Sequence, residues 1–226
     1  MIPFNLSIPT IITIAVAGVT ATGTDWIMRD HPTLTNKLTI PHLLLPTLSA
    51  WILSVSLNNL ADVPLKWTVL IIGGVFIYLV ILAEYIVLNP QDYRAPIAMA
   101  MLTAIAYAMI LALAVALVST DQRLIVLLPA IAVGAGILSM RILQLQTKLA
   151  WPVLEATACL LMIAQLATAM HYLPVTAISF GIMIMGALFS MVNFILNIER
   201  EIKFRRSLIE AAIPSILTII LAIWLN

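Results

Sequence analysis

The sequence predicts an all-α integral membrane protein with eight transmembrane helices. Of its 226 residues, 63% are hydrophobic and only 9% are charged, with a mean hydropathy of +1.12. Eight long apolar stretches fill nearly the whole chain, and nine of the eleven Lys and Arg residues fall into alternate gaps between them. A chain of this composition would aggregate as a water-soluble domain, whereas it suits a lipid bilayer as its solvent.

Each stretch is long enough to cross a membrane. An α-helix needs about 20 residues to span about 30 Å of hydrocarbon. Helices are expected because a bilayer offers no partner to an unpaired backbone group, and the stretches lack the two-residue alternation of a barrel strand. The expected helices are Leu6–Met28, Ile40–Leu60, Trp67–Leu88, Ile97–Val118, Leu124–Leu143, Trp151–His171, Val175–Leu196 and Leu208–Leu225.

The basic residues predict the orientation. The odd-numbered gaps hold nine of them, Arg29, Lys37, Arg94, Arg141, Lys148, Arg200, Lys203, Arg205 and Arg206. The even-numbered gaps hold only Lys66 and Arg123. Because basic loops stay in the cytoplasm, this bias places both termini on the non-cytoplasmic side of a cell (inner) membrane. The gaps are short, so sequential helices are expected to be antiparallel neighbours.

A single polytopic transmembrane domain, residues 1–226, accounts for the whole length. No segment between the stretches is long enough to bury a core of its own. A weak similarity at an offset of about 111 residues, such as Pro41 with Pro152 and Gly74 with Gly186, suggests halves 1–118 and 119–226. Such a four-plus-four duplication would be a parallel repeat. Chance alignment of evenly spaced helices is the alternative.

Five ionisable residues lie inside or at the ends of the expected helices. Each costs roughly 2.5–3.5 kcal/mol near the centre of a bilayer, so each needs a reason. All lie near the expected cytoplasmic ends, where an arginine and several carboxylates could form one neutralising network or a site for a proton, an ion or a lipid headgroup. Independent snorkelling to the interface is the alternative. The five are Asp25, Glu84, Arg141, Glu155 and Glu210, of which Glu84 is the deepest.

Two further patterns indicate contact surfaces. Small side chains repeat every four residues in the fourth helix and predict close packing, either against another helix of this chain or against another subunit. This alanine stripe comprises Ala100, Ala104, Ala108, Ala112 and Ala116. After the seventh stretch, Glu199 and Lys203 stand four residues apart, so the helix is expected to continue about two turns past Leu196. The basic segment there, Arg200, Lys203, Arg205 and Arg206, is either a solvated helix end or a contact for anionic headgroups or a partner.

The sequence indicates no cofactor or metal. His31 and His42 are expected inside and His171 outside, so the three are not expected to share a metal, and no phosphate-binding loop or metalloprotease motif is present. The single cysteine, Cys159, excludes an intramolecular disulfide and is expected to be a packing residue. A net charge of +1 gives no reason to expect nucleic acid as a partner.

Three classes of function remain. The favoured one is a non-catalytic subunit of a larger membrane assembly, with the lipid bilayer and other membrane subunits, or further copies of itself, as partners. The second is a small transporter or channel, which would need a polar path to the midplane. Only four polar side chains lie there: Thr13, Ser54, Tyr78 and Gln165. The third is an enzyme that acts on lipid at the inner leaflet through Glu84, Arg141, Glu155 and Glu210.

Overall fold

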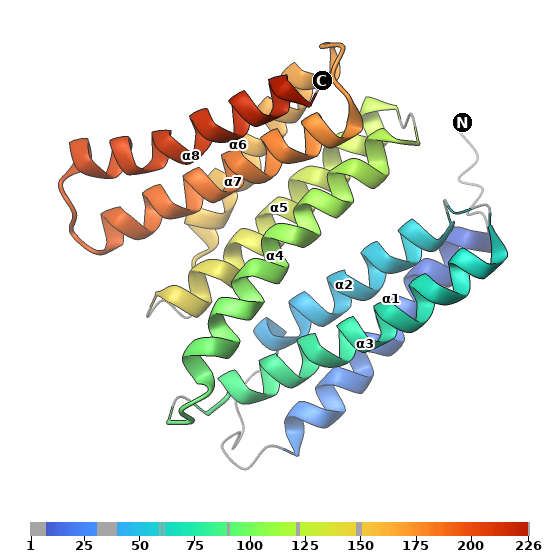
Figure 1. Cartoon of the computed structure of the whole chain (residues 1–226). Coiled ribbons are helices and arrows are strands. Elements are labelled where there is room, and N and C mark those ends of the chain that lie inside the picture. The colour runs from blue at the N-terminus through green and yellow to red at the C-terminus, as the bar shows by residue number, and fades with distance from the viewer. Residues whose placement is uncertain are drawn as a thin grey trace, which may run out of the picture. The chain divides into compact units, whose positions relative to one another are not determined.

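A computed structural model describes residues 8–30, 40–58, 60, 62–89, 91–120, 123–147 and 151–225 (Figure 1). Leu6, His31, Lys37 and Lys148, which entered the expectations above, lie outside these residues. The described part of the chain contains helices and no strand. The helices are α1 (Ile8–Arg29), α2 (Ile40–Asn58), α3 (Val63–Val87), α4 (Ala95–Val118), α5 (Leu124–Gln146), α6 (Val153–His171), α7 (Ala177–Glu199) and α8 (Phe204–Trp224). All eight are long and apolar enough to cross a membrane, which confirms the predicted fold class.

Several helices begin earlier than the hydropathy pattern suggests. The third begins at Val63 rather than Trp67, with Pro64 in its first turn. Proline fits there because its missing N–H would have no helical partner in the first turn anyway. The eighth begins at Phe204 rather than Leu208. Hydropathy marks only the apolar part of a helix, whereas the helix itself extends into the polar interface.

The chain divides into two compact units, residues 1–102 and 103–226, and each is described by itself. The first unit contains α1, α2, α3 and the start of α4. Its second helix packs against both α1 and α3. The Ser54 hydroxyl donates to the Thr13 hydroxyl at 3.3 Å and so joins α2 to α1. Gly73 of α3 lies directly against the side chain of Leu53 on α2, because no side chain separates the two helices at that point.

The second unit contains the rest of α4 with α5, α6, α7 and α8. The α7–α8 pair packs most closely: Gly186 faces Thr218, and the Ser215 hydroxyl donates to the Ser190 hydroxyl at 2.7 Å. Nearer the other end of the pair, the Ser179 hydroxyl donates to the Ala222 carbonyl at 2.9 Å. The partners on α8 rise in number as those on α7 fall, so the two helices are antiparallel.

The fourth helix joins this second core through larger side chains. Leu113 of α4 lies over Gly134 of α5, while Leu111 and Val115 lie against Gly181 of α7. Fully buried apolar side chains from α5 and α7 fill the centre of the unit, among them Ile131, Leu138, Ile142 and Leu188. The halves 1–118 and 119–226 of the possible repeat remain a prediction, since the compact units divide instead within α4.

Three helices contain an internal proline and continue through it: Pro46 in α2, Pro129 in α5 and Pro214 in α8. A proline lacks the N–H that would bond the carbonyl four residues earlier. Hydroxyl groups bind the carbonyls of two of these prolines. The Ser49 hydroxyl donates to the Pro46 carbonyl at 2.7 Å, and the Thr218 hydroxyl donates to the Pro214 carbonyl at 3.0 Å.

The expected two-turn extension of the seventh helix is wrong. Helix α7 ends at Glu199, where a tight turn leads into α8. The Ile202 N–H donates to the Asn197 carbonyl at 3.0 Å and the Glu201 N–H donates to the Ile198 carbonyl at 2.9 Å. These two bonds form a Schellman motif, which stops the helix and satisfies its last carbonyls. The motif outweighs the weak side-chain pairing that favoured a longer helix.

Glu201 occupies the left-handed position of this motif, with a φ of 58°. A side chain there costs roughly 1 kcal/mol relative to glycine. We therefore expect Glu201→Gly to raise the free energy of unfolding by about 1 kcal/mol, measured by thermal unfolding in detergent. Glu199→Gly, inside the last helical turn, is the matched control and should lower it by a similar amount. Equal destabilisation by both variants would contradict the role of the motif.

Candidate functional site

A buried hydrogen bond joins a histidine and a glutamate in the first unit. Nδ1 of His42, in the first turn of α2, lies 2.9 Å from Oε2 of Glu84, in the last turn of α3. The Glu84 side chain is fully buried, and that of His42 is 17% exposed. Two antiparallel helices bring these residues together although 42 positions separate them in the sequence.

This pair explains how a span tolerates a fully buried carboxyl group. A charged side chain away from water needs a hydrogen-bonding partner, and imidazole supplies one. The pair carries no net charge as imidazolium with carboxylate or as imidazole with carboxylic acid. The cost of a carboxyl group in a bilayer marked Glu84, whereas His42 alone reads as an isolated residue at a helix start.

Two other acidic residues of the predicted network have local partners. Asp25 accepts from Arg29 one turn along α1, at 2.7 Å. Glu210 of α8 accepts from the side-chain amide of Asn197 on α7 at 2.9 Å and from Arg206 at 2.8 Å. The Asn197 bond ties α7 to α8 beside the Schellman turn.

The remaining two members belong to the second unit. Arg141 is buried on α5, at 3% exposed, and Glu155 is half-buried in the first turn of α6. A carboxylate is favourable at a helix start because of the helix dipole. Asp25 and Glu84 lie in the first unit, whereas Arg141, Glu155 and Glu210 lie in the second. Convergence of all five thus stays a prediction.

Most of the alanine stripe lies on a side of α4 that its own compact unit leaves uncovered. Ala100, Ala104, Ala108 and Ala112 are exposed, and Ala116 is half-buried. The buried positions of α4 lie on a different face and include Leu102, Ala106, Ile110 and Leu113. Because the position of the first unit relative to the second is not determined, contact with another helix of this chain and contact with another subunit both stay predictions.

The polar side chain of Gln165 faces outward from its span. Gln165, six residues before the end of α6, is exposed, and its amide makes no hydrogen bond to the described residues. Thr13 and Ser54, by contrast, are buried and bonded to each other. Tyr78, on α3, is 63% exposed. Thr13, Ser54 and Tyr78 belong to the first unit and Gln165 to the second, so a shared path through all four stays a prediction.

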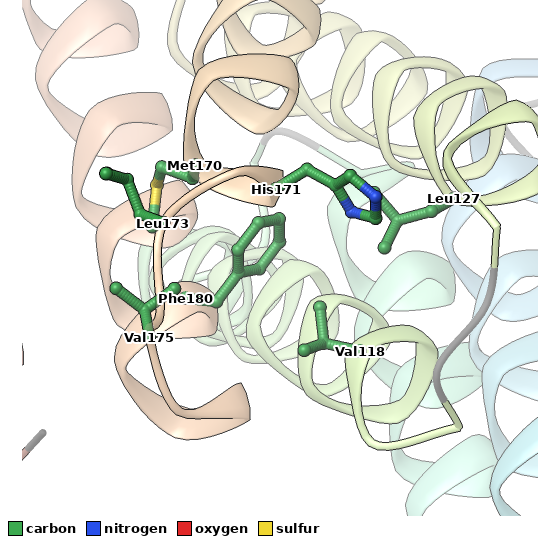
Figure 2. Close-up of a pocket in the computed structure, with 7 residues that line it drawn as sticks. All are labelled: Val118, Leu127, Met170, His171, Leu173, Val175 and Phe180. Atoms are coloured by element: carbon green, nitrogen blue, oxygen red, sulfur yellow. The ribbon is translucent and has the colours of Figure 1, made fainter.

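A pocket of about 190 Å³ opens where the ends of α4 and α6 meet the starts of α5 and α7 (Figure 2). Its lining combines one imidazole with apolar side chains: Val118, Leu127, Met170, His171, Leu173, Val175 and Phe180. Figure 2 shows the Phe180 ring in the middle of the lining and the His171 ring beside Leu127. A cavity of about 150 Å³ holds a benzene-sized molecule, so a small apolar group with one hydrogen-bonding atom fits. Sequence reasoning missed this pocket because its residues come from four separate segments.

A second cavity, of about 300 Å³, lies between α4, α7 and α8. Tyr107, Phe189, Pro214 and Leu217 line it together with Met185, Gly186 and Thr218. The rings of Tyr107 and Phe189 pack edge to face, with centroids 5.2 Å apart. The cavity exposes only apolar atoms, because the Thr218 hydroxyl bonds its own helix. We call it the apolar groove.

The described residues contain no group of three or more His, Cys, Asp or Glu side chains that could hold a metal ion. Cys159 is buried in α6. Several polar side chains of the described spans join one helix to the next, whereas many others bond the backbone of their own helix, which suits a structural role for them.

Eight apolar helices, joined by short connections and by buried polar bonds, define a multi-pass helical membrane protein. The chain belongs to the DUF5656 family, described as proteins of unknown function, whose model matches residues 1–225. No curated protein and no solved structure matches it.

Proposed function

We propose that this protein is a non-catalytic integral subunit of a larger membrane assembly, and that a transmembrane helix of another subunit covers its Gln165 face. The observation that carries the proposal is the exposed Gln165 amide. It lies about 9 Å along the helix axis from the nearer end of α6, too far for the side chain to reach water. An amide facing hydrocarbon without a partner costs several kcal/mol.

A partner helix would remove that cost. Amide side chains hydrogen-bond across helices in membranes, where no water competes. The partner should therefore present a hydrogen-bonding side chain such as Asn, Gln, Ser or Thr. A second copy of this chain could supply its own Gln165.

The alanine stripe supports the same proposal. Ala104, Ala108 and Ala112 lie one turn apart on the exposed side of α4, while the helix packs into its own unit through other residues. Small side chains let the backbone of a second helix approach closely, and van der Waals contact then drives association.

One observation favours a transporter as the second candidate. The imidazole of His42 is partly exposed while its partner Glu84 is buried, an arrangement that can pass a proton from the surface to a buried group. Against a polar path, the Thr13 and Ser54 hydroxyls bond each other.

Gln165→Leu tests the first proposal. We expect the assembly to dissociate more readily, by about fivefold, since an interhelical hydrogen bond contributes about 1 kcal/mol. The measurement is quantitative cross-linking and native mass spectrometry after gentle purification. Met162→Leu, at an exposed position on the same helix, is the control and should leave the assembly intact. Unchanged association together with a higher melting temperature of Gln165→Leu would show that the amide faces only lipid.

Ala108→Leu tests the stripe. The change should weaken association by ~1–3 kcal/mol through overpacking, without changing the stability of the isolated chain. Ala15→Leu, at an exposed position of α1, is the matched control. If both variants associate as the wild type does, the stripe faces lipid.

A further inference from the structure

The second unit carries an apolar groove and a basic turn on the same face of its α7–α8 pair. The groove offers methyl, methylene and aromatic groups from α4, α7 and α8. The basic segment, Arg200, Lys203, Arg205 and Arg206, forms the connection from α7 to α8 and the first turn of α8, and is called the basic turn below. We propose that this face binds one phospholipid, with its phosphate at the basic turn and the end of one acyl chain in the apolar groove.

The separation of the two features fits a lipid. Arg206 and Leu217 are eleven residues apart on α8, about 16 Å along the helix axis. Half of a hydrocarbon core is about 15 Å, so a phosphate at Arg206 places the end of its chain at the groove. A groove at this depth that opens sideways meets only the hydrocarbon of the bilayer.

Side chains at helical spacing lie between the basic turn and the apolar groove on both helices. On α8, Arg206, Glu210 and Leu217 follow one another at spacings of four and seven residues, so they share one side of the helix. On α7, Phe189, Asn193 and Asn197 do the same at spacings of four. The Asn197–Glu210 bond at 2.9 Å joins the two stripes.

The polar part of this surface suits a phospholipid. Asn193 donates one amide N–H to the Phe189 carbonyl at 2.9 Å. Its other N–H lies one turn deeper than Asn197, at the depth where a phospholipid presents its ester carbonyls.

The excess of basic residues at the basic turn favours an anionic phosphate as the ligand. Four basic residues stand near three carboxylates, those of Glu199, Glu201 and Glu210. Glu210 is already engaged by Asn197 and Arg206. Lys203 is exposed, lies three residues before Arg206 on the groove side, and stands beside the positive end of the α8 dipole.

The test uses nanodiscs that contain phosphatidylglycerol with a photoreactive diazirine near the end of one chain. Labelling should concentrate on the two segments that line the groove, 185–189 and 214–218, and peptide mass spectrometry locates it. Diacylglycerol with the same diazirine chain should label these segments several-fold less, because it lacks the phosphate. Equal labelling by the two lipids, or labelling spread evenly over the exposed faces of α8, would overturn the proposal.

Two pairs of variants sharpen the result. Leu217→Phe fills the groove and should abolish labelling there, whereas Ile216→Phe, at an exposed position of α8 that does not line the groove, should not. Lys203→Gln should lower phosphatidylglycerol labelling about fivefold, since one lysine at a membrane surface contributes on that order. Arg205→Gln, which points away from the groove side, should leave it unchanged. Equal effects within either pair would also overturn the proposal.

Discussion

Gly186→Ala should lower the free energy of unfolding of the second unit by about 3 kcal/mol. The new methyl group would lie 2.5 Å from both Cβ and Cγ2 of Thr218. The Cβ of threonine cannot rotate away, so the α7 and α8 backbones must separate. That separation also stretches the nearby bond between Ser215 and Ser190. Thermal unfolding in detergent measures the effect.

Gly18→Ala is the control for this substitution. A methyl group at Gly18 meets no other atom within 4 Å, and alanine favours a helix over glycine by about 1 kcal/mol. Gly18→Ala should therefore be neutral or stabilising. The same melting temperature for both variants would show that α7 and α8 do not depend on their close approach.

His42→Ala should lower the free energy of unfolding of the first unit by about 3 kcal/mol, because it removes the imidazole bound to a buried carboxyl group. The loss should fall below about 1 kcal/mol when Glu84 is replaced by leucine as well, since the double variant then buries no ionisable group at this point.

Glu84→Leu alone completes the double-mutant cycle. Additive effects of the two substitutions would mean that His42 and Glu84 do not interact. A stable His42→Ala variant that has lost a proton-dependent activity would instead favour the transporter interpretation.

The eight helices could be predicted from the sequence, because a stretch of about 20 apolar residues is specific to a membrane span. The residues at which some helices begin and end could not be predicted in the same way. Val63 and Phe204 begin helices within polar flanks that hydropathy cannot assign, and the stop at Glu199 depends on a backbone conformation at Glu201 that does not favour glutamate.

Only one residue of the His42–Glu84 pair was predicted from the sequence. Glu84 was marked by its cost in a bilayer, but His42 was not. A signal did exist: His42 and Glu84 are equally distant in sequence from Val63, as are Leu53 and Gly73, which also touch. Folding α2 and α3 as an antiparallel pair about that point would have brought both pairs together.

The alanine stripe shows a limit of spacing arguments. A repeat of four residues shows that Ala104 and Ala108 share a face of α4, but not which face meets the core. Larger residues, Ile110 and Leu113, take the buried side. In a soluble protein, the apolar face of a helix is the buried one. In a transmembrane helix both faces are apolar, so hydropathy does not show which face meets the core.

Pro46 and Pro214 make α2 and α8 easier to bend close to the polar bonds that join these helices to their neighbours. Pro46 stands four residues after His42, and Pro214 four residues after Glu210, so each removes the backbone bond to the residue whose side chain ties two helices together. Helices bend most easily at such points. As bilayer thickness changes, we expect α2 and α8 to tilt beyond these prolines while the polar bonds hold their ends in register. In α2 and α8, the end before the proline would then stay fixed by its polar bond, while the part after the proline adapts to the bilayer.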